Sequence, residues 1–263
     1  MLDLALSFLS TGLAVARLSR LCTVGAFCVA KKDDWLRLVL DCRLSNLLCR
    51  RPPYSHLATA SAITQMRVGV PGPGSGSGYR GAIGAVDLRD SFYLFRWVSL
   101  SKLFALEGVF SAGELGVEFA YDDDEQLVRV SADTLLYVCM STIPMGWSWS
   151  LYFCHWICAK LSIDALRGVG LSSTDAALRV ITDGRRAPLI LEGKPVAAPY
   201  VDNFNFFAWV QAEIDAILAR LVRRLTDLGL AFRVECPGAA SYDVVGLRID
   251  LGSLRVYNKP DRV

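Results

Sequence analysis

The sequence predicts an α+β fold in which an antiparallel sheet is backed by helices on one face. Apolar residues make up 53% of the 263 residues and charged residues 21%, so the chain can bury a sizeable core. Strand signals and helix signals follow one another without the regular alternation of a parallel sheet. The segment from Ile214 to Leu228 has the period of an amphipathic helix, and Gly229 supplies its stop signal.

The first element is an apolar segment from Leu4 to Ala16, within an N-terminal region of residues 1–23. It ends in Ala14-Val15-Ala16, which imitates a signal-peptide cleavage site, but Asp3 stands where such a peptide carries a basic region. It is also too short to span a bilayer. We expect a helix packed on the domain, or an extension from a misplaced start codon. A membrane or secreted protein is disfavoured.

Residues 24–68 come next and contain two strands around a polar turn, with the turn at Lys31 to Asp34. Pro52 and Pro53 end this unit, because consecutive prolines interrupt helix and sheet alike. Residues 69–80 are rich in Gly, Pro and Ser and lack apolar periodicity, so we expect a mobile linker.

Residues 81–250 form the largest expected segment, and residues 251–263 begin whatever follows it. The segment opens with a buried strand from Ile83 to Leu88, and the residues after Asp90 look helical. The acidic run at residues 122–125 could be a metal cluster, but it sits between two strand signals and favours a solvated hairpin tip.

The second half of that segment begins with a buried helix at Trp147 to Leu161. A strand pair follows at Val196 to Trp209, bent at Asp202-Asn203, since Asx residues tolerate tight turns. After the amphipathic helix come two strand signals, at Leu230–Val234 and Asp243–Ile249.

Composition excludes several classes of protein. The net charge is only +2, so any nucleic-acid site must be a local basic patch and not a field of the whole chain. The eight cysteines form no Cys-x-x-Cys pair and there are only two histidines, which argues against structural zinc. We expect the cysteines to be buried, reduced thiols.

Asp87 and Asp202 each stand in an intensely apolar stretch, and a carboxylate there is costly to bury unless it pairs or binds a cation. Either residue alone could simply cap a helix or make a turn. Together they are what a divalent-metal site needs, because Mg²⁺ takes one or two carboxylates plus substrate phosphates. Two such ions ~4 Å apart can activate a hydroxyl and steady a leaving pyrophosphate.

Four motifs, in order, resemble those of retroelement reverse transcriptases. Residues 31–46 (KKDDWLRLVLDCRLSN) are similar to the family's "KKDG.WR.V.D.R.LN" hairpin, and residues 86–92 (VDLRDSF) to motif A, "DL.DAF". Residues 143–150 (IPMGWSWS) resemble motif B, "LPMGWS.S", and residues 200–203 (YVDN) resemble motif C, "YVDD". The resemblance covers roughly residues 24–250 and implies a right-hand polymerase architecture of fingers and palm. The motif spellings look most like retrotransposon polymerases of dinoflagellate-type genomes.

The resemblance implies an RNA-directed DNA polymerase, which adds deoxynucleotides to a primer 3′-hydroxyl with two Mg²⁺ (or Mn²⁺) ions. Asp87 and Asp202 would ligate the ions, and the backbone carbonyl of Leu88 would add a contact. Asn203 would complete the catalytic turn. Phe92 would be the steric gate against a 2′-hydroxyl, unless it is simply a core aromatic.

The resemblance also implies a nucleotide site. Lys31 or Lys32, with Arg37, would grip the incoming triphosphate, unless they are only a solvated hairpin tip. Gly146 would let the backbone approach the new base pair closely, beside Met145. The implied partners are deoxynucleoside triphosphates and an RNA or DNA template with its primer, in the nucleus or cytoplasm and away from membranes.

Motif C departs from the family, because Asn203 stands where most members have a second Asp. Asn can still offer a carbonyl oxygen to a metal ion, with less charge. The chain also has no room for a full thumb, so we expect a part of a longer polyprotein, a truncated gene model or a decayed insertion. The alternative function is a catalytically silent relic, or a domesticated nucleic-acid-binding protein that keeps the polymerase fold.

Overall fold

The chain folds as two units whose segments interleave along the sequence. The computed structural model describes residues 1–30, 36–69 and 80–259. Unit 1 consists of Met1–Pro53 and Asp90–Leu151, and unit 2 consists of Tyr54–Arg89 and Tyr152–Val263. The segments expected from the sequence are continuous stretches of chain, whereas each unit combines two stretches. Residues 90–151 of the expected 81–250 segment belong to unit 1. They do so because β10 (Leu135–Met140) pairs with β1 (Ala14–Arg17).

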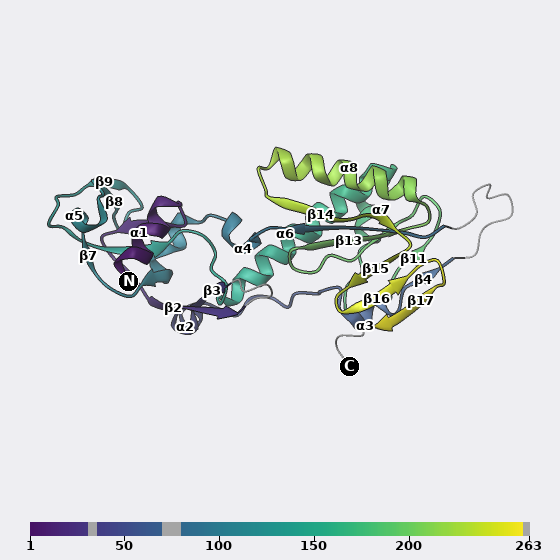
Figure 1. Ribbon diagram of the computed structural model, residues 1–263, viewed down its shortest axis with the longest axis horizontal. Coiled ribbons are helices and arrows are strands. Elements are labelled where there is room, and N and C mark those ends of the chain that lie inside the picture. The colour runs from purple at the N-terminus through teal and green to yellow at the C-terminus, as the bar shows by residue number, and fades with distance from the viewer. Residues whose placement is uncertain (31–35, 70–79, 260–263) are drawn as a thin grey trace. The chain divides into compact units, whose positions relative to one another are not determined.

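Unit 1 is built on one mixed sheet with the strand order β3-β2-β6-β10-β1-β8-β9, and β7 pairs with β10. Figure 1 shows the β2–β3 and β8–β9 strand pairs of this sheet. Short helices connect the strands. The elements of unit 1 are α1 (Leu2–Ser10), β1 (Ala14–Arg17), β2 (Thr23–Ala30), β3 (Leu36–Asp41), α2 (Arg43–Leu48), α4 (Ser91–Leu94), the 3₁₀ helix η1 (Val98–Phe104), β6 (Ala105–Leu106), β7 (Phe110–Ser111), α5 (Ala112–Leu115), β8 (Phe119–Tyr121), β9 (Leu127–Arg129) and β10 (Leu135–Met140).

The predicted hairpins of unit 1 are present. β2 pairs with β3 in antiparallel register, and β8 pairs with β9, although the turn at residues 31–35 lies outside the described residues. The expected N-terminal helix is correct only as far as Ser10. The helix expectation was wrong for Ala14–Ala16, which form the buried strand β1 after the turn at Gly12 (φ +73°). Apolar residues in a row are equally typical of a fully buried strand.

The acidic turn at residues 122–125 is less solvated than predicted. The Arg17 side chain of β1 is fully buried, and its Nη2 donates to Glu125 Oε1 at 2.7 Å and to the Asp122 carbonyl at 2.9 Å. The hydrogen bond from Arg17 lowers the pKa of the Glu125 carboxyl. The turn therefore binds the buried guanidinium of Arg17. The sequence predicted a solvated hairpin tip at residues 122–125 and did not predict this contact.

In its described residues, unit 2 contains two antiparallel sheets, the parallel pair of β4 and β11, and the long helices. Its elements are α3 (Ala60–Ile63), β4 (Arg67–Val68), β5 (Ala82–Leu88), α6 (Ser148–Leu166, which begins in unit 1), the 3₁₀ helix η2 (Arg167–Val169), α7 (Ser173–Ala177), β11 (Leu189–Ile190), β12 (Val196–Ala197), β13 (Asn203–Ala208), α8 (Gln211–Asp227), β14 (Phe232–Ala239), β15 (Ser241–Val244), β16 (Leu247–Asp250) and β17 (Arg255–Asn258). Of the expected linker, residues 70–79 lie outside the described part of the chain.

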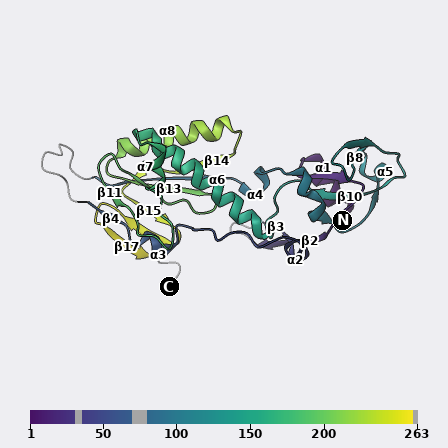
Figure 2. The ribbon, with the colours of Figure 1, turned by 180° about the vertical axis from the view of Figure 1, so that it is seen from behind.

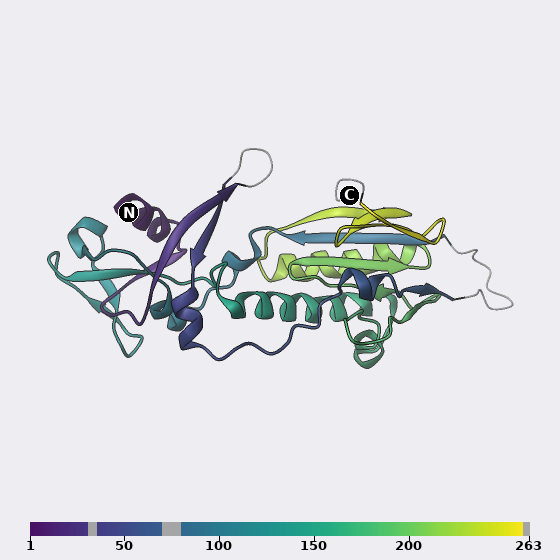
Figure 3. The ribbon, with the colours of Figure 1, turned by 90° about the horizontal axis from the view of Figure 1, so that it is seen from below.

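The central sheet of unit 2 has the order β12-β13-β5-β14, with every pair antiparallel. Helices α6 and α8 lie along the same side of this sheet (Figure 2 and Figure 3). Side chains of β5 and β13, including Val86, Leu88 and Phe204, share one buried cluster with both helices. This arrangement confirms the predicted α+β class, an antiparallel sheet backed by helices.

The opposite face of the central sheet carries the hairpin of β15 and β16. Ile83 and Phe207 pack there against Val244, Leu247 and Ile249. The single strand expected at Asp243–Ile249 is wrong, because Val245 (φ +49°) and Gly246 (φ +78°) form a two-residue turn between β15 and β16. Across the described residues, no helix is both long and apolar enough to cross a membrane.

Candidate active site

The candidate site begins at the tight turn between Tyr200 and Asn203. The backbone amides of these two residues each donate to the carbonyl of the other, at 2.8 and 2.9 Å. The apex is therefore Val201-Asp202 and not Asp202-Asn203 as predicted, since Asn203 is already the first residue of β13. Val201 has φ +57°. A β-branched residue is strained there, and such strain concentrates at functional sites.

Strand pairing brings the two predicted carboxylates to neighbouring positions. Asn203 of β13 stands opposite Asp87 of β5, and the Leu88 amide donates to the Asp202 carbonyl at 3.1 Å. Asp87 and Asp202 are both half-buried. Two acidic residues from distant parts of the sequence therefore occupy neighbouring backbone positions at one end of the central sheet.

Asn203 contacts its neighbour Asp202 through its amide nitrogen. Asn203 Nδ2 donates to Asp202 Oδ1 at 2.9 Å. An ionised carboxylate only accepts hydrogen bonds, so this amide orientation is the favourable one. Asn203 thus serves here as a hydrogen-bond donor that orients Asp202.

Two cysteines of α6 donate hydrogen bonds to backbone carbonyls of the turn. Cys154 Sγ donates to the Val201 carbonyl and Cys158 Sγ donates to the Asn203 carbonyl, both at 3.6 Å. Burial raises the pKa of Cys158 well above the usual thiol value, and the nearby Cys154, Asp202 and Asp87 raise it further. Cys158 therefore stays protonated and can donate. The sequence showed only two buried cysteines one helical turn apart, and their role under the turn was missed.

The donor set suits a divalent ion that also binds a nucleotide. Within the described residues no group of three or more His, Cys, Asp or Glu side chains could hold a metal on its own. Mg²⁺ commonly binds proteins through one or two carboxylates and completes its six ligands with water and substrate phosphates. Asp87 and Asp202 fit that pattern, whereas a structural zinc or calcium cage would need more ligands.

The predicted motif B loop lies in unit 1, and the fold itself accounts for its glycine. Gly146 has φ +117°, and a Cβ there would lie 2.1 Å from the Leu40 carbonyl oxygen. Asn46 clamps the loop, because its Nδ2 donates to the Gly146 carbonyl at 3.1 Å and its Oδ1 accepts from the Ser148 amide at 2.8 Å. Met145 is half-buried. Asn46 was seen only as part of a motif, and this clamping role was missed.

The predicted triphosphate grip is described only in part. Lys31 and Lys32 lie outside the described residues, and Arg37 is exposed on β3. Arg43, at the start of α2, is paired with Asp41, with Nη2 2.5 Å from Oδ2. This ion pair therefore adds no net positive charge to the surface. Phe92, the expected steric gate, is half-buried on α4.

A small polar pocket lies beside Asn203. Its volume is about 230 Å³. Residues of β13, β14 and β15 and of the adjoining turns line it: Tyr200, Asn203, Asn205, Glu235, Tyr242, Asp243, Val244 and Val245. Glu235 accepts a hydrogen bond from the Tyr242 hydroxyl at 2.8 Å. The Val201-Asp202 turn is thus accessible from the sheet face that the helices do not cover.

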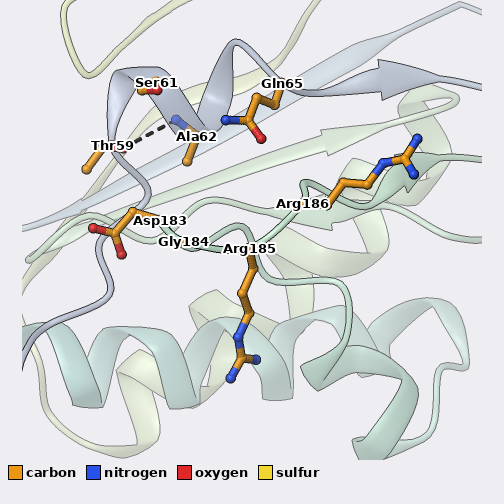
Figure 4. A pocket seen from close by; sticks show the side chains of 8 residues that line it. All are labelled: Thr59, Ser61, Ala62, Gln65, Asp183, Gly184, Arg185 and Arg186. Atoms are coloured by element: carbon orange, nitrogen blue, oxygen red, sulfur yellow. Dashed lines mark hydrogen bonds between the residues drawn. The ribbon is translucent and has the colours of Figure 1, made fainter.

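A second pocket of unit 2, of about 280 Å³, is less suited to a ligand. Figure 4 shows that Arg185 and Arg186 point in different directions and that Asp183 points away from both. Asp183 is occupied by contacts with the Tyr54 hydroxyl and with His56 Nδ1, the latter at 3.3 Å. Ligand sites usually show convergent polar groups, and this pocket has none among its labelled side chains.

Comparison with known proteins shows the fold. No family model matches the chain, and no curated protein matches its sequence. Its structure is similar to that of foamy viral protease-reverse transcriptase dRH in complex with double-stranded DNA, with a TM-score of 0.58 and 14% identity over 97% of this chain and 33% of that one. A foamy viral protease-reverse transcriptase with double-stranded DNA gives 0.58 and 13% over 97% and 40%, respectively.

A Prototype Foamy Virus protease-reverse transcriptase mutant gives a TM-score of 0.54 and 13% identity, over 96% of this chain and 25% of that one. The chain spans about a third of the length of the first of these proteins. It has a reverse-transcriptase-like fold.

Proposed function

We propose that this chain is the fingers and palm of an RNA-directed DNA polymerase, and that Asp87 and Asp202 hold its divalent ions. The observation that carries the proposal is that strand pairing places Asp87 of β5 next to the strained Val201-Asp202 turn. The likeness to reverse-transcriptase structures supports it.

The chemistry proposed is the addition of a deoxynucleotide to a primer 3′-hydroxyl. Bound Mg²⁺ or Mn²⁺ ions would lower the pKa of that hydroxyl and offset the charge on the leaving pyrophosphate. Asp87 and Asp202 would hold two ions, with the Leu88 carbonyl as a further oxygen ligand. Asn203 would keep Asp202 oriented through the hydrogen bond described above.

The nucleotide would be bound by the residues that the motif resemblance implies. Lys31, Lys32 and the exposed Arg37 would contact the triphosphate, because cations there offset the charge of the leaving group. Phe92 would exclude a 2′-hydroxyl. Met145 and Gly146 would border the new base pair on a loop that Asn46 holds in place.

The partners proposed are an RNA or DNA template with a primer, and deoxynucleoside triphosphates. Two of the similar structures hold double-stranded DNA, which is consistent with a nucleic-acid partner. We place the chain with retrotransposon polymerases, most like those of dinoflagellate-type genomes, within a longer polyprotein and inside the cell, in nucleus or cytoplasm.

The test is primer extension on an RNA template with Mg²⁺ and with Mn²⁺. We expect the natural chain to extend the primer, and Asp87→Asn or Asp202→Asn to lower the rate by about 10³-fold, which corresponds to roughly 4 kcal/mol of lost transition-state stabilisation. Asp227→Asn at the exposed end of α8 is the matched control and should leave the rate unchanged. Equal rates for Asp202→Asn and the natural chain would refute the assignment.

A catalytically silent, nucleic-acid-binding protein is the second candidate. The observation that favours it is Asn203, which adds no charge to the site and donates its amide hydrogen to Asp202. This candidate predicts no extension with either ion, together with primer–template binding that weakens steeply with salt, because Lys and Arg contacts release phosphate counterions. Salt-independent binding would exclude both candidates.

A further inference from the structure

We propose that Arg233 is a built-in counter-ion of Asp87 that weakens metal binding and so sets how much divalent ion the site requires. This inference rests on the proposed function, since it takes Asp87 and Asp202 to be metal ligands. It concerns a strand, β14, to which no motif drew attention.

The strand register places Arg233 beside Asp87. β14 pairs with β5 in antiparallel register, and Arg233 stands opposite Asp87. On the other side of β5, Asn203 stands opposite the same residue. Residues directly opposite each other in an antiparallel pair have Cβ atoms roughly 4.5–5.5 Å apart and lie on the same face. Asn203, Asp87 and Arg233 therefore form a row across three strands.

Burial shows which face this row occupies. Leu88 and Phe232, the next pair along the same two strands, pack into the buried cluster with α6 and α8. Successive side chains of a strand alternate between faces, so Asp87 and Arg233 lie on the face away from the helices. Arg233 is exposed and Asp87 is half-buried, so both side chains are accessible to solvent on this face.

The nearest acid along β14 has another partner. Glu235 accepts a hydrogen bond from the Tyr242 hydroxyl at 2.8 Å. A bulge between Val234 and Cys236 also interrupts the pairing there. Asp87 is therefore the carboxylate that the strand register offers to Arg233.

The charges of the row decide its effect on metal ions. Asp87 and Asp202 carry two negative charges, Arg233 carries one positive charge, and Asn203 carries none. A divalent ion on Asp87 is repelled by the cation a few ångströms away, so its affinity falls. In the metal-free protein the same cation offsets the repulsion between the two carboxylates. Arg233 thus favours the metal-free site over the occupied one.

The experiment measures Mn²⁺ binding without nucleotide or primer, by electron paramagnetic resonance and by the Mn²⁺-induced shift in Tm. We expect Arg233→Gln to lower the Mn²⁺ Kd about three- to tenfold, the range for one unit charge close to a divalent ion in a largely aqueous setting. Arg233→Lys keeps the charge and should stay within about twofold of the natural chain, by the same reasoning. Arg223→Gln, on the exposed side of α8, removes the same charge from the other face and should change nothing.

The outcomes separate this inference from the function on which it rests. If Asp87→Asn leaves Mn²⁺ binding unchanged, the proposed metal site fails. If Asp87→Asn abolishes binding but Arg233→Gln leaves it unchanged or weakens it, the counter-ion inference alone is overturned. A second measurement in EDTA checks the same charge, because Arg233→Gln should lower the Tm of the metal-free protein and Arg223→Gln should not.

Discussion

Two loops of the molecule each hold a residue at positive φ, and they use it differently. In unit 1 the loop from Pro144 to Ser148 contains Gly146 at φ +117°, and in unit 2 the turn from Tyr200 to Asn203 contains Val201 at φ +57°. Glycine adopts such angles without steric cost, whereas a β-branched residue does not. The residue at positive φ is therefore unstrained in the first loop, where it is glycine, and strained in the second, where it is valine.

The surroundings sharpen this difference. The Leu40 carbonyl oxygen would lie 2.1 Å from a Cβ at Gly146, and Asn46 satisfies the loop backbone, so packing alone explains that glycine. Packing does not explain why the turn in unit 2 combines a strained valine with the half-buried Asp202 next to Asp87. Strain that the fold does not require is the better indicator of chemistry.

The largest expected effect is at Gly146. We predict that Gly146→Ala lowers the free energy of unfolding of unit 1 by about 3–5 kcal/mol, because the new methyl group meets a backbone carbonyl and the φ angle is also unfavourable. Urea unfolding followed by circular dichroism measures the loss, and hydrogen exchange of the β10 amides assigns it to unit 1.

Gly116→Ala is the matched control for this prediction. Gly116 lies in the same unit at φ +64°, and a Cβ there would have nothing within 4 Å. Only the backbone cost applies, which is about 1 kcal/mol. If Gly146→Ala costs no more than Gly116→Ala, the packing account of the motif B loop is wrong.

A smaller effect of opposite sign is expected at Val201. Of the two central residues of its turn only Val201 has positive φ, a pattern that favours glycine at that position. We predict that Val201→Gly raises the free energy of unfolding by about 0.5–1 kcal/mol by removing strain, and that it lowers nucleotide incorporation. Thermal unfolding and primer extension on the same preparation measure the two effects.

Leu254→Gly is the counterpart in a turn that does not line the pocket beside Asn203. Leu254 has φ +56° in the turn between β16 and β17, so the same kind of substitution should bring a gain in stability and leave incorporation unchanged. Equal activity of Val201→Gly and the natural chain would mean that the strain at Val201 has no part in function.

The sequence predicted elements best where a local pattern was complete. The helix ending before Gly229 was correct because its apolar stripe repeats over four turns and glycine at φ +67° ends it. The turn apex was placed one residue too late, because Asx preference is local whereas the pairing of Asn203 with Asp87 decides where β13 begins. The neighbouring positions of Asp87 and Asp202 in the sheet were predicted from the order of the motifs along the chain.

Features that depend on distant pairing were not predictable from single segments. β1 belongs with β10 only through their register, and Arg17 is buried only because the acidic turn folds over it. Asn46 and Gly146 come together through hydrogen bonds across the chain, which no local pattern encodes. The position of Arg233 opposite Asp87 likewise depends on the register between β14 and β5, which the sequence did not predict.

An expected change in stability as small as that at Val201 is at Asn203, where the turn can be given the acid that most reverse transcriptases with a similar motif C carry. Asn203→Asp replaces the amide donor of the 2.9 Å hydrogen bond to Asp202 with a third carboxylate, at almost unchanged volume. In EDTA we predict a loss of about 0.5–1 kcal/mol from repulsion and the lost hydrogen bond. With Mn²⁺ or Mg²⁺ the stability change should become a gain, because the added charge holds the ions more tightly. Incorporation should therefore stay intact or rise at lower Mg²⁺.

Thermal unfolding in EDTA and in each ion, with incorporation across a metal titration, measures both effects. If the natural chain is inert with both ions and Asn203→Asp neither restores activity nor gains stability from metal, the silent nucleic-acid-binding protein is the correct reading of this turn.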